Sequence, residues 1–323
     1  MGYLKREPFV PSPETVIWRY MDGWKFEELL KRFSEHEKWQ QQEPGTRTVH
    51  FNDPGQLWFA FPSAFGDDKE GRFPDLNEDP KSYCDRMASL MGLSDEESAR
   101  RQKRFLNADT KAMQDAIFFM AQLCGVSSWH VNTSEAADMW TEFVAEKNGV
   151  TIRSTCQQVE HGLSYAHNSP ARRSSPSVCA VGYVDHSDYF LPHDDYRSLL
   201  SIVQESYSHE NEVRFVAKSF GLATIPSTMK VQMPIESAAG ISDEEEWIQR
   251  KSDFLTEYTN KIREAYIQNR TSNLDGFNLP VSLSGLFSEV VLAHGCSPKF
   301  EREVSQLLND ADCGDVPVRR STI

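Results

Sequence analysis

Short runs rich in β-branched and aromatic residues recur along the chain, several of them alternating with polar residues. Such runs, bounded by Gly, Pro, Asn or Asp, are typical of β-strands. They predict strands at 15–20, 46–51, 57–61, 126–131, 150–155, 178–184, 213–217 and 286–292. The strands are unevenly spaced and no internal repeat is visible.

Apolar residues three and four positions apart predict helices between these strands. The helices are expected at 24–38, 134–147, 156–163, 194–207, 242–268 and 297–309, with further helical pieces over 82–124. Asp22 and Ser134 are expected to cap the helices that follow them. Because strands and helices alternate irregularly, the pattern predicts an α+β fold: a mixed, largely antiparallel sheet with flanking helices and a helical insertion at about 82–124.

The strand signals extend from residue 15 to residue 292 without a clear linker, which favours one hydrophobic core. We therefore expect a single α+β domain over residues 15–310. The proline-bearing residues 1–14 are expected to form an N-terminal arm, and residues 311–323 a C-terminal tail.

The chain carries a net charge of −14. Nucleic-acid phosphates and anionic lipids repel such a protein, so we expect neither non-specific nucleic-acid binding nor membrane association. No run approaches the ~18 apolar residues of a membrane-spanning helix, and the first residues lack the apolar segment of a secretory signal. The six cysteines have no zinc-ligand spacing and are expected to be reduced thiols. These features predict a cytoplasmic protein.

Several common catalytic motifs are absent from the sequence. It contains no dinucleotide-binding G-x-G-x-x-G, no Walker A loop, no G-x-S-x-G and no H-E-x-x-H. The nine histidines are scattered, and none pairs with another at helical ligand spacing. We therefore expect no metal site.

Two predicted strands carry side chains that could take part in chemistry. Arg19 lies between Trp18 and Tyr20 in an apolar strand. It could face solvent, or it could bind a phosphate or carboxylate through paired hydrogen bonds. Ser154 and Thr155 end another strand, where such residues often cap the next helix.

Acidic residues gather in two further segments. Alternation along the strand places Glu210, Glu212 and Arg214 on one face. On an edge strand this row would be ordinary surface; in a cleft it could orient a sugar hydroxyl, stabilise an oxocarbenium ion or bind a metal. The segment 67–71, which contains Asp68 and Glu70, could be an ordinary acidic loop or a cation site.

Taken in order, several segments resemble the bacterial family known as domain of unknown function 2971. The resemblance covers about residues 15–310. In that family the acidic segment is closer to Asn-Asp-Pro-x-Glu, and this chain departs from the pattern there. The matching segments are Trp18-Arg19-Tyr20, Phe65 to Gly71, Met139-Trp140, Gly149 to Thr155, Glu210 to Arg214 and His294 to Ser297.

The order of Arg, Ser-Thr and Glu-x-Glu also resembles the Arg-Ser-Glu class of ADP-ribosyltransferases. In addition, residues 15–33 look like the start of the DarT-type DNA-modifying toxins. The resemblance implies an NAD-consuming enzyme, as a toxin or defence effector, that needs no metal and acts on an unknown macromolecular acceptor. It implies that Arg19 and Tyr20 hold NAD, that Ser154 and Thr155 shape the pocket, that Glu212 is catalytic and that Glu210 addresses the acceptor.

Two other functions remain open from the residues. In a metal-dependent nuclease or phosphodiesterase, Asp68, Glu70, Glu210 and Glu212 would hold a divalent cation, with Arg214 near the phosphate. In a non-catalytic sensor or interaction module, exposed aromatic residues such as Trp58 and Trp247 would bind a partner. The oligomeric state is not indicated by the sequence.

Overall fold

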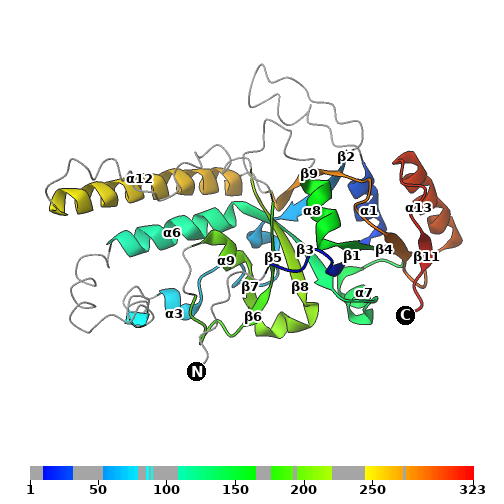
Figure 1. Ribbon diagram of the computed structural model, residues 1–323, viewed down its shortest axis with the longest axis horizontal. Helices are drawn as coiled ribbons and strands as arrows, with labels where there is room; N and C mark the ends of the chain where they lie inside the picture. The colour runs from blue at the N-terminus through cyan, green and yellow to red at the C-terminus, as the bar shows by residue number, and fades with distance from the viewer. Residues whose placement is uncertain are drawn as a thin grey trace, which may run out of the picture.

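The computed structural model describes residues 10–31, 54–78, 85–86, 89, 108–164, 176–191, 195–219, 244–271 and 274–323. Over these residues a mixed, mostly antiparallel sheet is flanked by helices, which confirms the expected α+β class. Figure 1 shows the sheet in the middle of an elongated molecule, with a pair of helices at one end and the C-terminal helix at the other.

Nine of the described strands form the main sheet, and only its terminal pair, β10 with β11, is parallel. β8 (Glu212–Lys218) pairs with β3, and β5 (Ser177–Ala180) pairs with β8. Two further strands, β6 (Gly182–Val184) and β7 (Ile202–Gln204), form a small parallel pair. The remaining order is β11 (Val318–Arg320), β10 (Glu289–Leu292), β4 (Gly149–Thr155), β1 (Val16–Asp22), β3 (Cys124–Val131), β2 (Pro54–Ala60) and β9 (Gly276–Ser282).

The sheet forks at β3. β8 pairs with one edge of this strand from Cys124 to His130. β1 and β2 therefore share the opposite edge, where β1 pairs at Val131 and His130 and β2 pairs at Val126. Between these two contacts β1 and β2 diverge, which leaves a gap beside the middle of β3.

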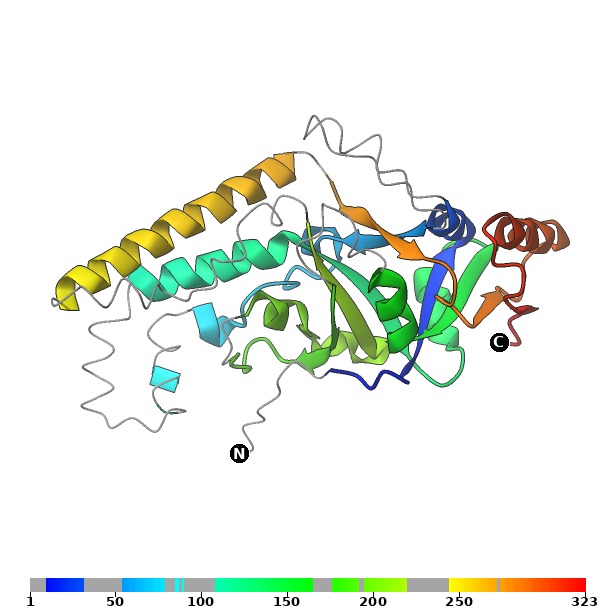
Figure 2. The same ribbon diagram turned by 45° about the horizontal axis from the view of Figure 1, so that its top comes forward.

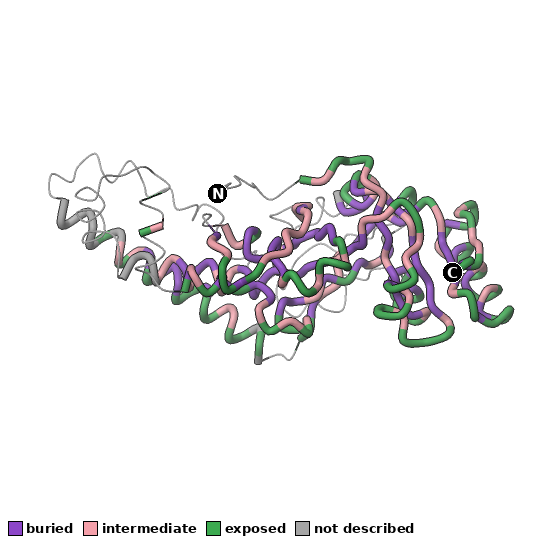
Figure 3. Tube along the Cα trace, turned by 90° about the horizontal axis from the view of Figure 1, so that it is seen from below, coloured by how far each residue is buried: buried purple, intermediate pink, exposed green. Residues whose placement is uncertain are grey.

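Helices cover both faces of the sheet. On one face α1 (Gly23–Leu30), α8 (Cys156–Ser164) and α13 (Pro298–Asp310) contribute to the largest hydrophobic core. On the other face α7 (Ala137–Phe143) packs on β1 through Trp18, Tyr20 and Met139. Figure 3 shows buried residues running through the middle of the molecule along the sheet.

A second core joins the sheet to α6 (Ala108–Gln122), α9 (Tyr196–Leu200) and α12 (Glu244–Thr271). Figures 1 and 2 both show α6 and α12 side by side, extending away from the sheet. α6 falls within the helical insertion predicted at 82–124. Most of the rest of that insertion lies outside the described residues.

The predicted strands within the described residues are found, with shifted ends; the prediction at 46–51 lies outside them. The predicted strand at 178–184 is divided into β5 and β6. Three strands were not predicted: β7, which lies in a segment expected to be helical, β9 and β11. β9 contains Pro280, which cannot donate to a ladder and is tolerated here because β9 lies at the edge of the sheet. β11 is formed by residues that we expected to be a tail, and it pairs with β10.

Helix boundaries differ more from the predictions. α7 covers only part of 134–147, and Ala136 rather than Ser134 occupies its N-cap. The segment 194–207 contains α9, β7 and the start of the 3-10 helix η3 (Glu205–Glu210) rather than one helix. Between β2 and α3 (Asp75–Glu78) the chain forms the 3-10 turn η1 (Pro62–Ala64) and an irregular segment with a turn at residues 68–71.

Asp22 occupies the N-cap position of α1 as predicted, but its side chain makes no capping hydrogen bond to the helix. Its Oδ1 atom instead accepts hydrogen bonds from the backbone N–H groups of Ala145, at 2.9 Å, and Glu146, at 3.2 Å. Asp22 thus fixes the loop between α7 and β4.

Five cysteines fall in the described part, and all are buried free thiols. This agrees with the expected reduced state, although Cys84 lies outside the described residues. None of the described helices is long and apolar enough to cross a membrane.

Candidate functional site

A cavity of about 540 Å³ lies at the fork, where β1 and β2 diverge from β3. Aromatic rings form much of its wall, and polar side chains from β1, β3 and β8 reach it. Three residues that line it are among the exposed large hydrophobic residues of the described chain: Trp24, Trp58 and Phe143. A largely apolar cavity with a few convergent polar groups is the usual form of a small-molecule site.

Arg19 lies across the fork. From β1 its guanidinium donates to the Oγ atom of Ser127 on β3 and, at 3.3 Å, to the backbone carbonyl of Trp58 on β2. It also lies 5.6 Å from the centre of the Trp129 ring. Burial lowers its pKa to about 10.

Within the described residues, Arg19 has no carboxylate partner, and its remaining N–H donors are left for a ligand. Taking a charge out of water without a counter-charge is costly. An anionic ligand in the cavity would supply that counter-charge, and the planar guanidinium suits phosphate or carboxylate oxygens.

Glu212 lines the cavity and is held by a buried ion network. Arg214, 2% exposed, donates from Nε to Glu212 Oε2 at 3.0 Å and from both terminal nitrogens to Glu70, at 2.7 and 3.1 Å. The backbone N–H of Glu212 donates to the Tyr183 hydroxyl at 2.8 Å. Burial raises the pKa of Glu70, against the lowering effect of Arg214. Glu212 is therefore a fixed carboxylate whose position does not depend on a ligand.

Glu210 reaches the same cavity from the end of η3. Burial raises its pKa to about 7, and the nearby carboxylates of Glu212 and Glu142 add to the rise. Such a carboxyl group can exchange a proton near neutral pH, as a general acid or base requires. Asn211, between the two glutamates, has a φ of 42°, a left-handed conformation that asparagine tolerates better than most residues.

β3 contributes two further polar side chains to the cavity, those of Ser128 and His130. His130 is 9% exposed, and its Nδ1 atom lies 2.5 Å from the backbone carbonyl oxygen of Glu210. The Nε2 atom of His130 and the Oγ atom of Ser128 are buried, and neither has a hydrogen-bond partner among the described residues. Unpaired buried polar atoms are uncommon in native proteins and point to a missing partner.

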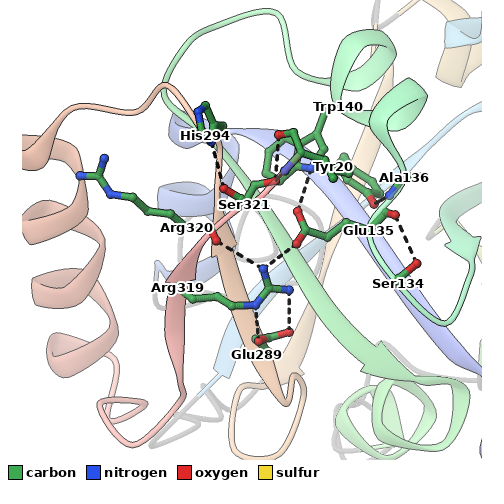
Figure 4. Close-up of polar contacts among 11 residues, drawn as sticks. Tyr20, Ser134, Glu135, Ala136, Trp140, Glu289, His294, Arg319, Arg320 and Ser321 are labelled. Carbon is green, nitrogen blue, oxygen red and sulfur yellow. Dashed lines mark hydrogen bonds and ion pairs between the residues drawn. The ribbon is translucent and has the colours of Figure 1, made fainter.

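Tyr20 forms part of the cavity wall, and its hydroxyl accepts a hydrogen bond of 2.8 Å from the backbone N–H of Ala136. Figure 4 shows this contact beside a second one, in which Arg319 of β11 bridges Glu135 and Glu289. Glu135 also accepts from the indole N–H of Trp140 in α7 at 3.2 Å. The C-terminal strand thus helps to hold the start of α7, the helix whose Met139 and Phe143 line the cavity.

Ser154 and Thr155 do not line the cavity. Ser154 is buried on the same face of the sheet as Arg19, and its hydroxyl donates to the backbone carbonyl of Leu286 at 2.5 Å. The Thr155 hydroxyl accepts from the backbone N–H of Gln158 at 3.2 Å in the first turn of α8. Their predicted role in shaping a nucleotide pocket has no support from the residues around this cavity. Arg19, Tyr20, Glu210 and Glu212 do line it, and Arg19 extends from the face of the sheet opposite to that of Tyr20 and Glu212.

The carboxylates expected in a metal-dependent nuclease are not gathered together. Glu70 and Glu212 are joined through Arg214, and Asp68 lies exposed in a loop. Among the described residues, the one group with donor atoms close enough to share a metal ion is Glu142, His209 and Glu210, whose atoms lie within 4.8 Å of one another. Two of the three are exposed side chains, and His209 is already paired with Glu142 at 3.1 Å.

Sequence patterns did not single out Ser128 and His130. A signal was nevertheless present in the segment VSSWHV, 126–131. Alternation places Val126, Ser128 and His130 on one face of the strand, so two polar side chains face one side of a strand that is otherwise buried. A buried face with polar residues needs partners for them.

Comparisons with known proteins add no further constraint on this site. No protein-family model matches the chain, no curated protein matches it and no solved structure matches it.

Proposed function

We propose that the cavity binds NAD and that the protein cleaves the bond between nicotinamide and ribose, passing ADP-ribose to an acceptor or to water. The observation that carries the proposal is Arg19, a cation without a carboxylate partner among the described residues, in one cavity with Glu210 and Glu212. The Arg19 guanidinium suits a pyrophosphate, and the two carboxylates suit a ribose that becomes cationic as the bond breaks. The aromatic walls suit a flat base.

In this mechanism the bond between C1′ of the ribose and the pyridinium nitrogen breaks, and its electron pair neutralises the leaving nicotinamide. Positive charge then develops on the ribose. Glu212, fixed by Arg214, stabilises that charge and orients a ribose hydroxyl. An oxygen or nitrogen nucleophile forms the new bond to C1′, and its proton passes to Glu210, whose pKa of about 7 suits this transfer.

The acceptor belongs to the proposal only as a class, a nucleophilic group on a macromolecule. We place the enzyme in the cytoplasm, because the described cysteines are free thiols rather than disulfides. Action as a toxin or defence effector would follow from uncontrolled consumption of NAD.

Release of nicotinamide from NAD by the purified full-length protein tests the proposal. We expect release by the wild type that is unaffected by EDTA, at least about 100-fold slower in Glu212→Gln because an electrostatic contact to the transition state is lost. Arg197→Met, which removes a partly exposed ion pair with Asp195, serves as the control and should retain the wild-type rate.

A metal-dependent phosphodiesterase is the second candidate, and the cluster of Glu142, His209 and Glu210 is the observation in its favour. It predicts hydrolysis of a phosphodiester that requires Mg²⁺ or Mn²⁺ and stops with EDTA. Nicotinamide release that EDTA leaves unchanged therefore separates the two functions.

A further inference from the structure

Two side chains of β3 that line the cavity each carry a buried polar atom without a partner among the described residues. These are Ser128 Oγ and His130 Nε2, both buried. His130 as a whole is 9% exposed. Since buried polar groups in native proteins are paired, a ligand in the cavity is the natural source of their partners.

The hydrogen bond at the other side of the imidazole determines what Nε2 can do. Nδ1 lies 2.5 Å from the carbonyl oxygen of Glu210, and a carbonyl oxygen only accepts. In the neutral imidazole Nδ1 therefore carries the proton, and Nε2 presents a lone pair. His130 requires a ligand atom that donates a hydrogen bond.

Ser128 lies two residues before His130 on the same strand, so the two side chains point to the same face about 6.6 Å apart at their Cα atoms. A hydroxyl group can donate or accept. Because the neighbouring His130 needs a donor, a ligand group that presents a donor and an acceptor side by side would satisfy both residues. A carboxamide has this form, with its N–H directed to Nε2 and its C=O directed to the serine hydroxyl.

The side chains around Ser128 and His130 indicate which kind of ring carries the carboxamide. The Tyr20 ring packs edge-on against His130, with centroids 6.4 Å apart, and further aromatic side chains line the cavity, which suits a flat ring. The carboxyl groups of Glu210 and Glu212 line the same cavity and suit a cationic ring.

We propose that Ser128 and His130 recognise the carboxamide of a flat, cationic heteroaromatic ring, the nicotinamide half of the substrate. The inference rests on the proposed function and deepens it, because it assigns the residues that select the leaving group. His130 Nε2 accepts from the amide N–H, and the Ser128 hydroxyl donates to the amide oxygen. Loss of the amide nitrogen leaves Nε2 unpaired in a buried position, which weakens binding about 10-fold or more.

Binding of two small cations to the full-length protein tests this selectivity without any reaction. 1-Methylnicotinamide carries the carboxamide, and 1-methyl-3-acetylpyridinium replaces the amide nitrogen with a methyl group at the same charge. Titrations followed by ligand-observed NMR should show that wild type binds the amide about 10-fold or more tightly. Equal affinity for the two cations would overturn the inference.

Two substitutions of one residue separate the two ring nitrogens. His130→Asn keeps a donor near the position of Nδ1 for the Glu210 carbonyl and removes the acceptor, so we expect the preference for the amide to vanish. His130→Gln places an amide oxygen near the position of Nε2 and should retain part of the preference. Urea denaturation should show that His130→Asn and the wild type unfold at the same urea concentration. Unchanged selectivity in such a folded variant would contradict the assignment.

Ser128→Ala provides the matched test of the other half of the carboxamide. Both cations keep a carbonyl oxygen, so the affinity for both should fall by a similar factor and the ratio should stay at its wild-type value. If Ser128→Ala binds both cations with wild-type affinity, Ser128 does not bind the carbonyl oxygen of the ligand.

These binding results are independent of turnover. Selective binding of 1-methylnicotinamide without release of nicotinamide from NAD would support the carboxamide site and end the proposed function. Release of nicotinamide from NAD by a protein that binds both cations equally would end the inference alone.

Discussion

Arg214 donates a hydrogen bond of 3.0 Å from Nε to the Oε2 atom of Glu212, two residues earlier on the same strand. The same guanidinium bonds both oxygens of Glu70 from the loop after β2. Burial lowers the pKa of Arg214, but Glu70 and Glu212 outweigh that effect and raise it above its usual value. One buried cation therefore holds the loop after β2 against β8 and fixes the carboxylate of Glu212, the proposed catalytic group.

Removal of that cation should be strongly destabilising. Arg214→Met leaves Glu70 and Glu212 buried without their counter-charge, and we expect the free energy of unfolding to fall by about 3–5 kcal/mol. Urea denaturation measures the change. Arg197→Met breaks a partly exposed pair and should cost less than about 1 kcal/mol. Similar losses in the two variants would show that the buried network is not a special support of the fold.

Arg19 should behave in the opposite way. Its charge is desolvated and has no carboxylate partner in the described chain, so Arg19→Gln should change the free energy of unfolding by less than about 1 kcal/mol in either direction. Its binding of a pyrophosphate should nevertheless weaken about 10–100-fold, since a charge-assisted hydrogen bond is lost. Titration with ADP-ribose and urea denaturation measure the two effects. A large loss of stability with unchanged affinity would make Arg19 a structural residue.

Glu210 gives the protein a pH dependence with a defined sign. Its pKa of about 7 in the folded protein is above the usual 4.5, so the folded state binds this proton more tightly than the unfolded state. The contribution to stability is fully present below pH 4.5 and is lost as the pH rises through about 7. The free energy of unfolding of Glu210→Gln, relative to that of the wild type, should therefore be higher at pH 8 than at pH 5.

The rate of nicotinamide release should also depend on this group. Because the carboxylate form of Glu210 accepts the proton, the wild-type rate should rise with pH through about 7, and Glu210→Gln should lose that rise. The pH profile of the two proteins at saturating NAD measures it. An identical rise in the variant would assign the titration to another group.

The fold was more accessible to sequence analysis than the site. The strands β1, β3, β4 and β8 were predicted because a strand buried in a sheet appears in the sequence as a run of hydrophobic residues. β9 was hidden by Pro280, which is compatible with a strand only at an edge, and the edge is a property of the whole sheet. The short β11 gains its stability from pairing with β10, and a three-residue run carries no pattern of its own.

The site depends on relations that a sequence does not display. Alternation correctly joined Glu212 with Arg214, since both lie on one strand. It could not show that the Ser154 hydroxyl donates to the Leu286 carbonyl and does not line the cavity, because this depends on a segment distant in the sequence. Nor could it show that Arg19 lacks a carboxylate partner in the described part of the chain, which requires the positions of the charged groups around it.

The C-terminal strand has a predicted role in the stability of the cavity wall. Arg319 joins Glu135, at 2.5 Å, to Glu289, at 2.7 Å, so Arg319→Ala leaves the buried carboxyl of Glu135 without its cation. We expect a loss of about 1–3 kcal/mol and faster amide hydrogen exchange in α7. Arg320→Ala, which removes an exposed pair with Glu301, is the adjacent control and should cost less than about 1 kcal/mol. Equal exchange in α7 of both variants would argue against this coupling.

Calorimetric titration of NAD into the Glu212→Gln variant measures binding to the cavity while the cleavage reaction is suppressed. We expect saturable binding of one NAD per chain, weakened about 10-fold or more when Arg19→Gln is added and unchanged when Arg197→Met is added. Absence of saturable NAD binding to both Glu212→Gln and wild type, in protein that unfolds cooperatively, would contradict the proposed function.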